Sequence, residues 1–245
     1  MSAKINTMFT ALFCLAAAVA APLLRAGDEI KFDAAKRIYT IGGKQLKCED
    51  NANLTILSNG KKIASTYQFI ATPYKYWQTS VKKKDGEYDG KQMEVREIKI
   101  DGDQVTYNGL ISWNKPDEKP LSGAWKVTVK PVGDGKIAVY CTYDVPQGQK
   151  RRDCGIFMNV PGIKEMNCGK LGTWVPFPKP EKNLSNWKPA SYQLIGKNAG
   201  DSFKIEAPIM TTQGSSLRFS FLLKAKEKAS FVLDFGKSVD AEVSK

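Results

Sequence analysis

The sequence predicts an all-β protein, a large antiparallel β-sandwich of the supersandwich or jelly-roll kind, preceded by a signal peptide. Three observations support this fold class. Short runs of β-branched and aromatic residues recur along the 245 residues, separated by Gly, Asn, Asp and Pro, which is the pattern of strands and turns. Some runs, such as 105–113, alternate apolar and polar residues, as half-buried strands do. No window has the apolar spacing of a long helix.

Four expected strand pairs flank tight-turn sequences rich in Gly, Asn and Asp, the residues that accept the backbone angles of hairpin loops. About twelve to fifteen strands at this spacing favour a two-sheet sandwich. A further pair of strands is expected at 217–224 and 229–235. The four hairpins are 37–41 with 45–49, 53–57 with 61–69, 93–100 with 104–113, and 125–131 with 136–145.

The N-terminal segment has the parts of a secretory signal peptide. Lys4 supplies the positive charge, the apolar run 8–20 follows, and small residues offer cleavage after residue 21 or 26. The run is shorter than the ~20 residues that span a bilayer, and no later stretch is apolar enough to do so. We therefore expect a signal peptide at 1–26 and a secreted or periplasmic single domain at 27–245. The proline-rich stretch 176–180 is expected to be a crossing loop within that domain, with a domain boundary near 180 as the alternative.

The chain contains no histidine, which excludes several kinds of catalysis. A Ser-His-Asp triad, a Cys-His pair and the common catalytic zinc sites all need imidazole. No C-x-x-C pair is present either. With both histidine and this motif missing, the sequence predicts no metal site, no cofactor and no catalytic residue. Paired carboxylates stay open as a catalytic device. However, Glu94 and Glu97 are three residues apart, and a regular strand points such residues to opposite faces, so they are expected to be surface charges.

The chain is basic, with 37 Lys and Arg against 25 Asp and Glu. Removal of Lys4 and Arg25 with the signal peptide lowers the formal net charge from +12 to +10. Such a surface suits acidic glycans or anionic envelope polymers, and the alternative is a solvated lysine-rich surface that aids solubility. Nucleic acid is excluded as a partner because the chain is exported and has no recognition motif or basic helix.

Four cysteines remain after cleavage: Cys48, Cys141, Cys154 and Cys168. An even number in an exported chain allows two disulfides with three possible pairings. Cys154 and Cys168 are close in sequence and are candidates to bridge neighbouring strands, which would leave Cys48 with Cys141. The alternative is buried thiols that act as small apolar residues.

Aromatic residues concentrate in the segment 74–77, close to a lysine cluster. Sugar rings stack their C–H faces on flat aromatic rings, and lysines bind hydroxyl or acidic groups. Trp113 and Trp125 lie in strong strands and are expected in the core, whereas Trp187 has a loop-like context. The predicted ligand-binding residues are Tyr74, Tyr76, Trp77, Lys82, Lys84 and Trp187.

The texture of the C-terminal half is similar to a known group of domains. The segments 139–146, 155–161, 169–170, 174–176 and 216–221 resemble accessory supersandwich or jelly-roll domains of secreted bacterial glycoside hydrolases. The resemblance implies a β-sandwich in a carbohydrate context and no activity of its own. Galactose-mutarotase-like supersandwiches are similar too, but their acid–base histidines have no counterpart in this chain.

The expected function is that of an exported, non-catalytic protein that binds a neutral or acidic polysaccharide or another cell-envelope polymer. One alternative is a carboxylate-dependent glycoside hydrolase or polysaccharide lyase. The other is a structural or assembly protein of the cell envelope that uses sheet edges or a basic face. The sequence leaves the oligomeric state open.

Overall fold

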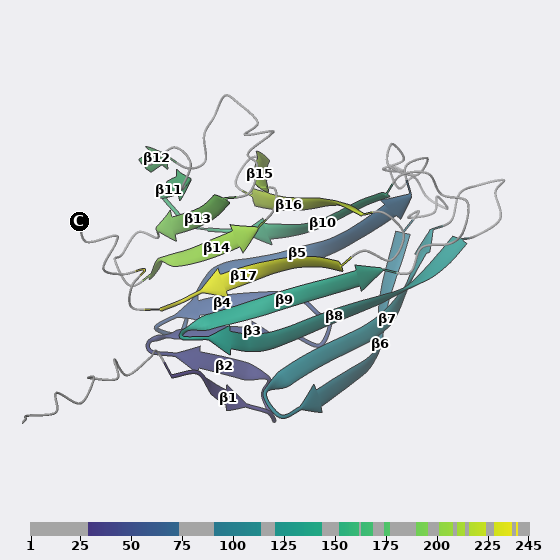
Figure 1. The fold of residues 1–245 in the computed structure, drawn as a ribbon, viewed down its shortest axis with the longest axis horizontal. Helices are drawn as coiled ribbons and strands as arrows, with labels where there is room; N and C mark the ends of the chain where they lie inside the picture. Colours follow the sequence, from purple (N-terminus) through teal and green to yellow (C-terminus); the bar gives the residue numbers. More distant parts are fainter. Residues whose placement is uncertain are drawn as a thin grey trace, which may run out of the picture.

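The structure, a computed structural model, describes residues 29–73, 91–113, 121–143, 152–161, 163–168, 174–176, 190–195, 201–207, 210–213, 216–223, 228–236 and 239. Almost all of these residues lie in strands of two antiparallel sheets that face each other (Figure 1). The prediction of an all-β antiparallel sandwich is therefore confirmed.

Most neighbouring strands of the two sheets are consecutive in the chain. The eight-stranded sheet has the order β1 (Lys31–Asp33), β2 (Ile38–Ile41), β3 (Lys44–Cys48), β4 (Leu54–Ser58), β5 (Lys61–Pro73), β10 (Arg152–Asn159), β16 (Ser216–Leu223) and β15 (Met210–Gln213). The nine-stranded sheet has the order β12 (Trp174–Pro176), β11 (Glu165–Cys168), β13 (Ala190–Ile195), β14 (Phe203–Ala207), β17 (Lys228–Asp234), β9 (Lys136–Tyr143), β8 (Leu121–Gly133), β7 (Gln104–Trp113) and β6 (Lys91–Asp101). The exceptions to consecutive order are the neighbours β5–β10, β10–β16, β14–β17 and β17–β9, between which the chain visits the other sheet, and β11–β13, since β12 lies on the other side of β11.

The four predicted hairpins are confirmed as β2–β3, β4–β5, β6–β7 and β8–β9. In the second, Asn59 and Gly60 have φ of 47° and 78°, the left-handed pair that a two-residue type I′ loop requires. The strands expected at 217–224 and 229–235 also form, as β16 and β17. They belong to different sheets, so this part of the chain crosses the sandwich instead of closing a hairpin. Pro176, at the end of β12, lies on the end strand of its sheet among the described residues, the position in which prolines occur within sheets.

The hydrophobic core lies between the sheets, and one cluster of buried side chains draws on both of them. In β3 and β4 buried and half-buried residues alternate, which places Leu46 and Ile56 inside. Val127 and Val129 of β8 belong to the same cluster from the other sheet. Full burial of a side chain of this kind stabilises the fold by roughly 1.5–3 kcal/mol. Trp125, which the sequence assigned to the core, is 3% exposed, so that assignment is confirmed.

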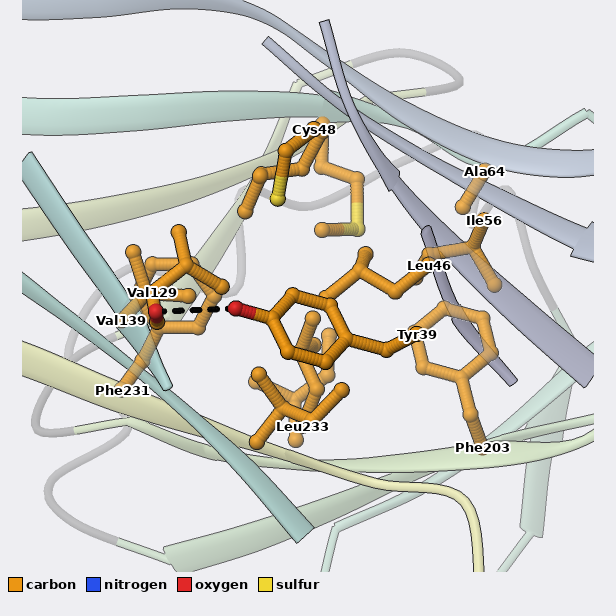
Figure 2. Close-up of a cluster of buried hydrophobic side chains, with 14 of the residues drawn as sticks. Tyr39, Leu46, Cys48, Ile56, Ala64, Val129, Val139, Phe203, Phe231 and Leu233 are labelled. Carbon is orange, nitrogen blue, oxygen red and sulfur yellow. Dashed lines mark hydrogen bonds between the residues drawn. The ribbon is translucent and has the colours of Figure 1, made fainter. Parts of the chain in front are cut away.

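Two fully buried tyrosines hydrogen-bond across the sandwich in opposite directions. Tyr39 on β2 donates from its hydroxyl to the carbonyl of Asp103, at 2.7 Å, and the same hydroxyl lies 3.0 Å from the carbonyl of Val129 (Figure 2). Tyr107 on β7 donates to the carbonyl of Glu49, at 2.9 Å, just beyond β3. Each sheet thus supplies a hydroxyl to the backbone of the other, and the two bonds fix how the sheets are offset.

Replacing Tyr39 with phenylalanine is expected to lower the free energy of unfolding by about 1–2 kcal/mol, because carbonyls on the opposite sheet lose a hydroxyl donor inside the core. Urea denaturation followed by tryptophan fluorescence measures the change. Tyr140→Phe is the matched control: its ring is half-buried on the outside of the sandwich, so its change is expected to stay within about 0.5 kcal/mol. Equal stability of the two variants would contradict the cross-sheet role of Tyr39.

The edge strand β6 contains a β-bulge that changes which residues share a face. Glu94 pairs with Leu110 and Glu97 pairs with Asn108, while the register shifts between Val95 and Glu97. Leu110 and Asn108 are two residues apart on β7, so Glu94 and Glu97 lie on the same outer face. The sequence-based expectation of opposite faces is wrong for this pair, because it assumed a regular strand and the bulge inserts one extra residue.

Gly109 marks a very close approach beside that bulge. A Cβ atom at this position would lie 2.0 Å from the carbonyl oxygen of Glu94 and 2.5 Å from the indole ring of Trp125. Gly109 pairs with Val95 on one side and with Trp125 on the other. The missing side chain therefore provides the space in which the indole packs against the inner face of β7.

Candidate functional site

The ligand-binding residues predicted from the sequence lie outside the described residues. Tyr74, Tyr76, Trp77, Lys82 and Lys84 belong to the segment 74–90, which connects β5 to β6, and Trp187 belongs to the segment 177–189, which connects β12 to β13. The candidate site is therefore sought on the described surfaces of the two sheets.

The outer face of the nine-stranded sheet offers a polar surface with an aromatic side chain at its centre. Along β8 the residues Trp125, Val127 and Val129 are buried, so the residues between them point outward. The same alternation on β9 turns Tyr140 and Thr142 outward. The outward residues of β8 and β9 that surround the ring, here called the Tyr140 face, are Lys126, Thr128, Lys130, Tyr140 and Thr142.

The register of β8 and β9 sets the geometry of the Tyr140 face. Tyr140 lies directly opposite Thr128, so Lys126 and Lys130 occupy the two diagonal positions, a separation that long side chains bridge. The Nζ atom of Lys130 is 5.4 Å from the centroid of the Tyr140 ring, within the range of a cation–π contact. The face thus combines one phenol ring, two ammonium groups and two threonine hydroxyls.

The charged residues around the Tyr140 face are neutralised by partners of opposite sign. On β6, Lys99 and Glu97 are 3.1 Å apart, and Asn108 donates to the Glu97 carboxylate at 2.9 Å. The hydrogen bonds from Lys99 and Asn108 lower the pKa of Glu97. Because no ion pair of the described residues involves Lys126 or Lys130, the Tyr140 face carries a local positive charge.

A second group of ion pairs, formed by Lys136, Glu206 and Asp234, lies on the β17 side of this face. The ammonium of Lys136 lies 3.5 Å from a carboxylate oxygen of Glu206 and 3.5 Å from one of Asp234. Burial tends to lower the pKa of Lys136, but the two carboxylates outweigh it and raise the pKa. The other oxygen of Asp234 accepts a hydrogen bond from the backbone N–H of Gly236 at 2.9 Å. This arrangement holds the end of β17 in place and does not expose a free acid.

The cysteines for which the structure describes side chains are thiols. Cys48 on β3 and Cys141 on β9 are both buried and not joined to each other, which matches the alternative that they serve as small apolar residues. Cys154 lies on β10 and Cys168 on β11, strands of different sheets. They are therefore not on neighbouring strands, and their side chains fall outside the described residues.

The environment of Cys48 is polar at one end of the core. Burial raises the pKa of this thiol to about 12, against the opposing effects of the Tyr107 hydroxyl and the Arg37 charge. The guanidinium of Arg37 donates to the Cys48 carbonyl at 3.2 Å and pairs with the exposed Asp50. A thiol held protonated in this way is a poor nucleophile, so Cys48 belongs to the core and not to a reactive site.

The described residues do not meet the requirements of a metal site or of a membrane-spanning helix. No group of three or more acidic or cysteine side chains converges there in a way that would hold a metal ion. Within the same residues no helix is long and apolar enough to cross a membrane.

The fold places the protein in the class of antiparallel β-sandwiches. No protein-family model matches the chain, and no curated protein matches it in sequence.

The binding residues predicted from the sequence do not include the Tyr140 face, although a signal for it exists. The run 125–131 reads Trp-Lys-Val-Thr-Val-Lys-Pro, and its alternation predicts an outward row of Lys, Thr and Lys. What the sequence does not supply is the register that places Tyr140 between those two lysines, because the register is a property of the folded sheet.

Proposed function

We propose that this protein is an exported, non-catalytic binder of an acidic polysaccharide or a similar anionic envelope polymer, and that the Tyr140 face is a binding surface. The observation that carries the proposal is the position of Tyr140 on the outer face of the sheet, between two lysines that form no ion pair with any described residue. The predicted signal peptide, the basic composition and the resemblance to accessory sandwich domains of secreted glycoside hydrolases support it from the sequence.

Each component of the Tyr140 face has a function in such binding. The tyrosine ring stacks against the C–H face of a sugar, and the ammonium groups of Lys126 and Lys130 pair with carboxylate or sulfate groups of the polymer. The hydroxyls of Thr128 and Thr142 bond to sugar hydroxyls. Because Lys130 lies over the ring in the free protein, a neutral sugar must displace an ammonium that an acidic sugar instead engages. This favours acidic polymers over neutral ones.

The carboxylate-dependent alternative finds less support in the described residues. Glu94 and Glu97 share a face, but each lies beside a basic partner, Arg96 at 3.4 Å and Lys99 at 3.1 Å, respectively. Both carboxylates are exposed on the edge strand of the sheet. A glycosidase needs two acids that face each other across a cleft, one of them with a raised pKa, whereas the pKa of Glu97 is lowered.

Affinity electrophoresis and titration calorimetry with polygalacturonate, alginate and a neutral glucan test the proposal. We expect binding to an acidic polymer that weakens with added salt. The double variant Lys126→Met/Lys130→Met is expected to bind roughly tenfold more weakly, since each exposed charge contact is worth about 0.5–1 kcal/mol. Tyr140→Ala is expected to lose roughly fivefold through the stacking contact.

The matched control is Lys61→Met/Lys62→Met, which removes the same charge from exposed positions at the start of β5 in the other sheet. We expect this control to keep nearly all of the affinity. If both double variants weaken binding equally, the interaction depends on net charge alone and the Tyr140 face is not the site. If the wild-type protein is retained by none of the polymers, the proposed function itself is wrong.

A further inference from the structure

The edge strand β6 has a sequence that is complementary to itself in the antiparallel direction. Among the described residues β6 ends the nine-stranded sheet and pairs with β7 on one side only. Its central six residues, 94–99, read Glu-Val-Arg-Glu-Ile-Lys. Reversing this run exchanges Glu with Lys, Val with Ile, and Arg with Glu. An edge strand with free backbone groups is a ready template for another strand, and this pattern specifies which strand fits.

One antiparallel register places every charged residue of the run 94–99 opposite a residue of opposite charge in a second β6. In that register Glu94 faces Lys99, Val95 faces Ile98, and Arg96 faces Glu97, and two-fold symmetry repeats each pair. Moving the register by two residues, which keeps the same faces together, destroys this match. One shift brings Arg96 opposite Lys99, and the other brings Glu94 opposite Glu97. Like charges directly opposite each other are unfavourable.

The faces of β6 and the position of its bulge agree with the same register. Glu94, Glu97 and Lys99 pair with the outward residues of β7, whereas Val95 and Ile98 point inward and pack against the core. Paired residues of two symmetry-related strands must lie on the same face. Glu94 and Lys99 both point outward, and Val95 and Ile98 both point inward, so these pairs meet that condition. Arg96, the bulge residue without a partner in β7, meets Glu97 next to the two-fold axis. The two bulges therefore coincide and do not interrupt the pairing.

We propose that β6 is a homodimerisation edge, at which two copies of this chain join antiparallel in that register to form one continuous sheet. Bulges and charges usually keep an edge strand from pairing. Here the bulge and the charges are both compatible with a second copy of β6 in this one register, and the charges disfavour the shifted registers. The side chains of Glu94, Arg96 and Lys99 are 62%, 57% and 64% exposed. Each has an ion-pair partner within its own strand, and its exposure lets it exchange that partner for one on a second copy.

The dimer has a consequence for the surface described above. A two-fold axis perpendicular to the sheet keeps the outer faces of both copies on the same side, so two Tyr140 faces would lie on one extended surface. A polymer that contacts both would gain avidity without new contacts. The dimerisation proposal itself does not depend on polymer binding, because its test measures mass in the absence of any ligand.

Sedimentation velocity and light scattering over a concentration series from low micromolar to millimolar test the proposal. We expect the wild-type protein to pass from the monomer mass to twice that mass. Glu94→Lys places two lysines opposite each other, and Lys99→Glu places two glutamates opposite each other, each twice by symmetry. Either single variant is expected to raise the dimer Kd roughly tenfold or more.

Two further samples separate specific pairing from a general charge effect. The double variant Glu94→Lys/Lys99→Glu restores opposite charges in every pair and is expected to recover most of the wild-type Kd. An equimolar mixture of the two single variants is expected to form a heterodimer, because Lys at position 94 of one chain meets Glu at 99 of the other, while the native Lys99 of the first meets the native Glu94 of the second. A wild-type protein that stays monomeric throughout the concentration series overturns the proposal. So does a mixture that associates no better than its components.

Discussion

Replacing Gly109 with alanine is expected to lower the free energy of unfolding by about 3 kcal/mol or more. The added Cβ would lie 2.0 Å from the Glu94 carbonyl oxygen and 2.5 Å from the Trp125 ring, well inside van der Waals contact. The indole can shift only at the expense of the core, and the carbonyl belongs to the backbone of the bulged strand β6. Either adjustment disturbs the pairing of β6 with β7 or that of β7 with β8. Urea denaturation at neutral pH measures the loss.

Gly43→Ala provides a matched control for that measurement. Its added Cβ would meet only the side chain of Asn59, with Oδ1 at 3.1 Å and Cγ at 3.9 Å, and a side-chain amide can rotate away. We expect this variant to change stability by less than about 1 kcal/mol. Adding Trp125→Leu to Gly109→Ala is expected not to rescue stability, because the contact with the Glu94 carbonyl remains. Near wild-type stability of Gly109→Ala would show that β6 can move away from β7 without cost.

The parts of the fold that sequence reasoning predicted are those that depend on local chemistry. The turn at Asn59-Gly60 needs two residues with positive φ, and only a few residue types supply them, so the hairpin can be predicted from a few letters. The burial of Trp125 follows from its place in an alternating strand. These rules act within about ten residues of chain, which is why the all-β class and the four hairpins are visible without coordinates.

The incorrect sequence predictions concern strand faces and strand pairing, which depend on contacts with distant parts of the chain. The bulge at Arg96 reverses the face expected for Glu97 relative to Glu94, and nothing in the alternation of that segment announces it. Strands β16 and β17 are adjacent in sequence, yet one pairs with β10 and the other with β9. Which sheet a strand joins is decided by long-range packing, and local residue patterns do not encode it.

The candidate site shows the same division. The sequence pattern places Lys126, Thr128 and Lys130 on one face of a strand, but Tyr140 lies in the following strand, where an aromatic residue is equally at home in the core. Only the register with β8 turns its ring toward the lysines. The cross-sheet bonds of Tyr39 and Tyr107 are invisible in the sequence for a similar reason, since their partners are backbone carbonyls, which every residue has.

Alkaline pH is expected to destabilise this protein strongly from about pH 9 upward. Burial raises the pKa of Cys48 from 9.0 to about 12, and burial likewise raises the pKa of Tyr39 and of Tyr107 above their ordinary 10.0. The three groups lie in one part of the core, and a charge on Cys48 raises the pKa of both tyrosines further. In the folded protein all three therefore hold their protons in a pH range where the unfolded chain releases them.

The sign of the effect follows from proton linkage. Where the folded state binds more protons than the unfolded state, stability falls as the pH rises. The contribution of Cys48 is fully present below about pH 9 and is lost as the pH approaches the folded-state value of about 12. At pH 11 the free energy of unfolding is lower by about 3 kcal/mol than at neutral pH because of this thiol alone. The tyrosines act in the same direction from about pH 10 upward. Because the chain has no histidine, stability is expected to change little between pH 6 and 8.

Urea denaturation at half-unit steps from pH 6 to 11 measures this profile. We expect a plateau to about pH 9 and then a decline that steepens above pH 10, where the tyrosines of the unfolded chain begin to ionise. The variant Cys48→Ala is expected to start from a lower plateau, because it leaves a small cavity, and to begin its decline about one pH unit later. If wild type and variant decline in parallel from the same pH, the thiol of Cys48 does not hold its proton through burial. In that case the alkaline loss comes from groups that the two proteins share, which are the buried Tyr39 and Tyr107 and the surface lysines.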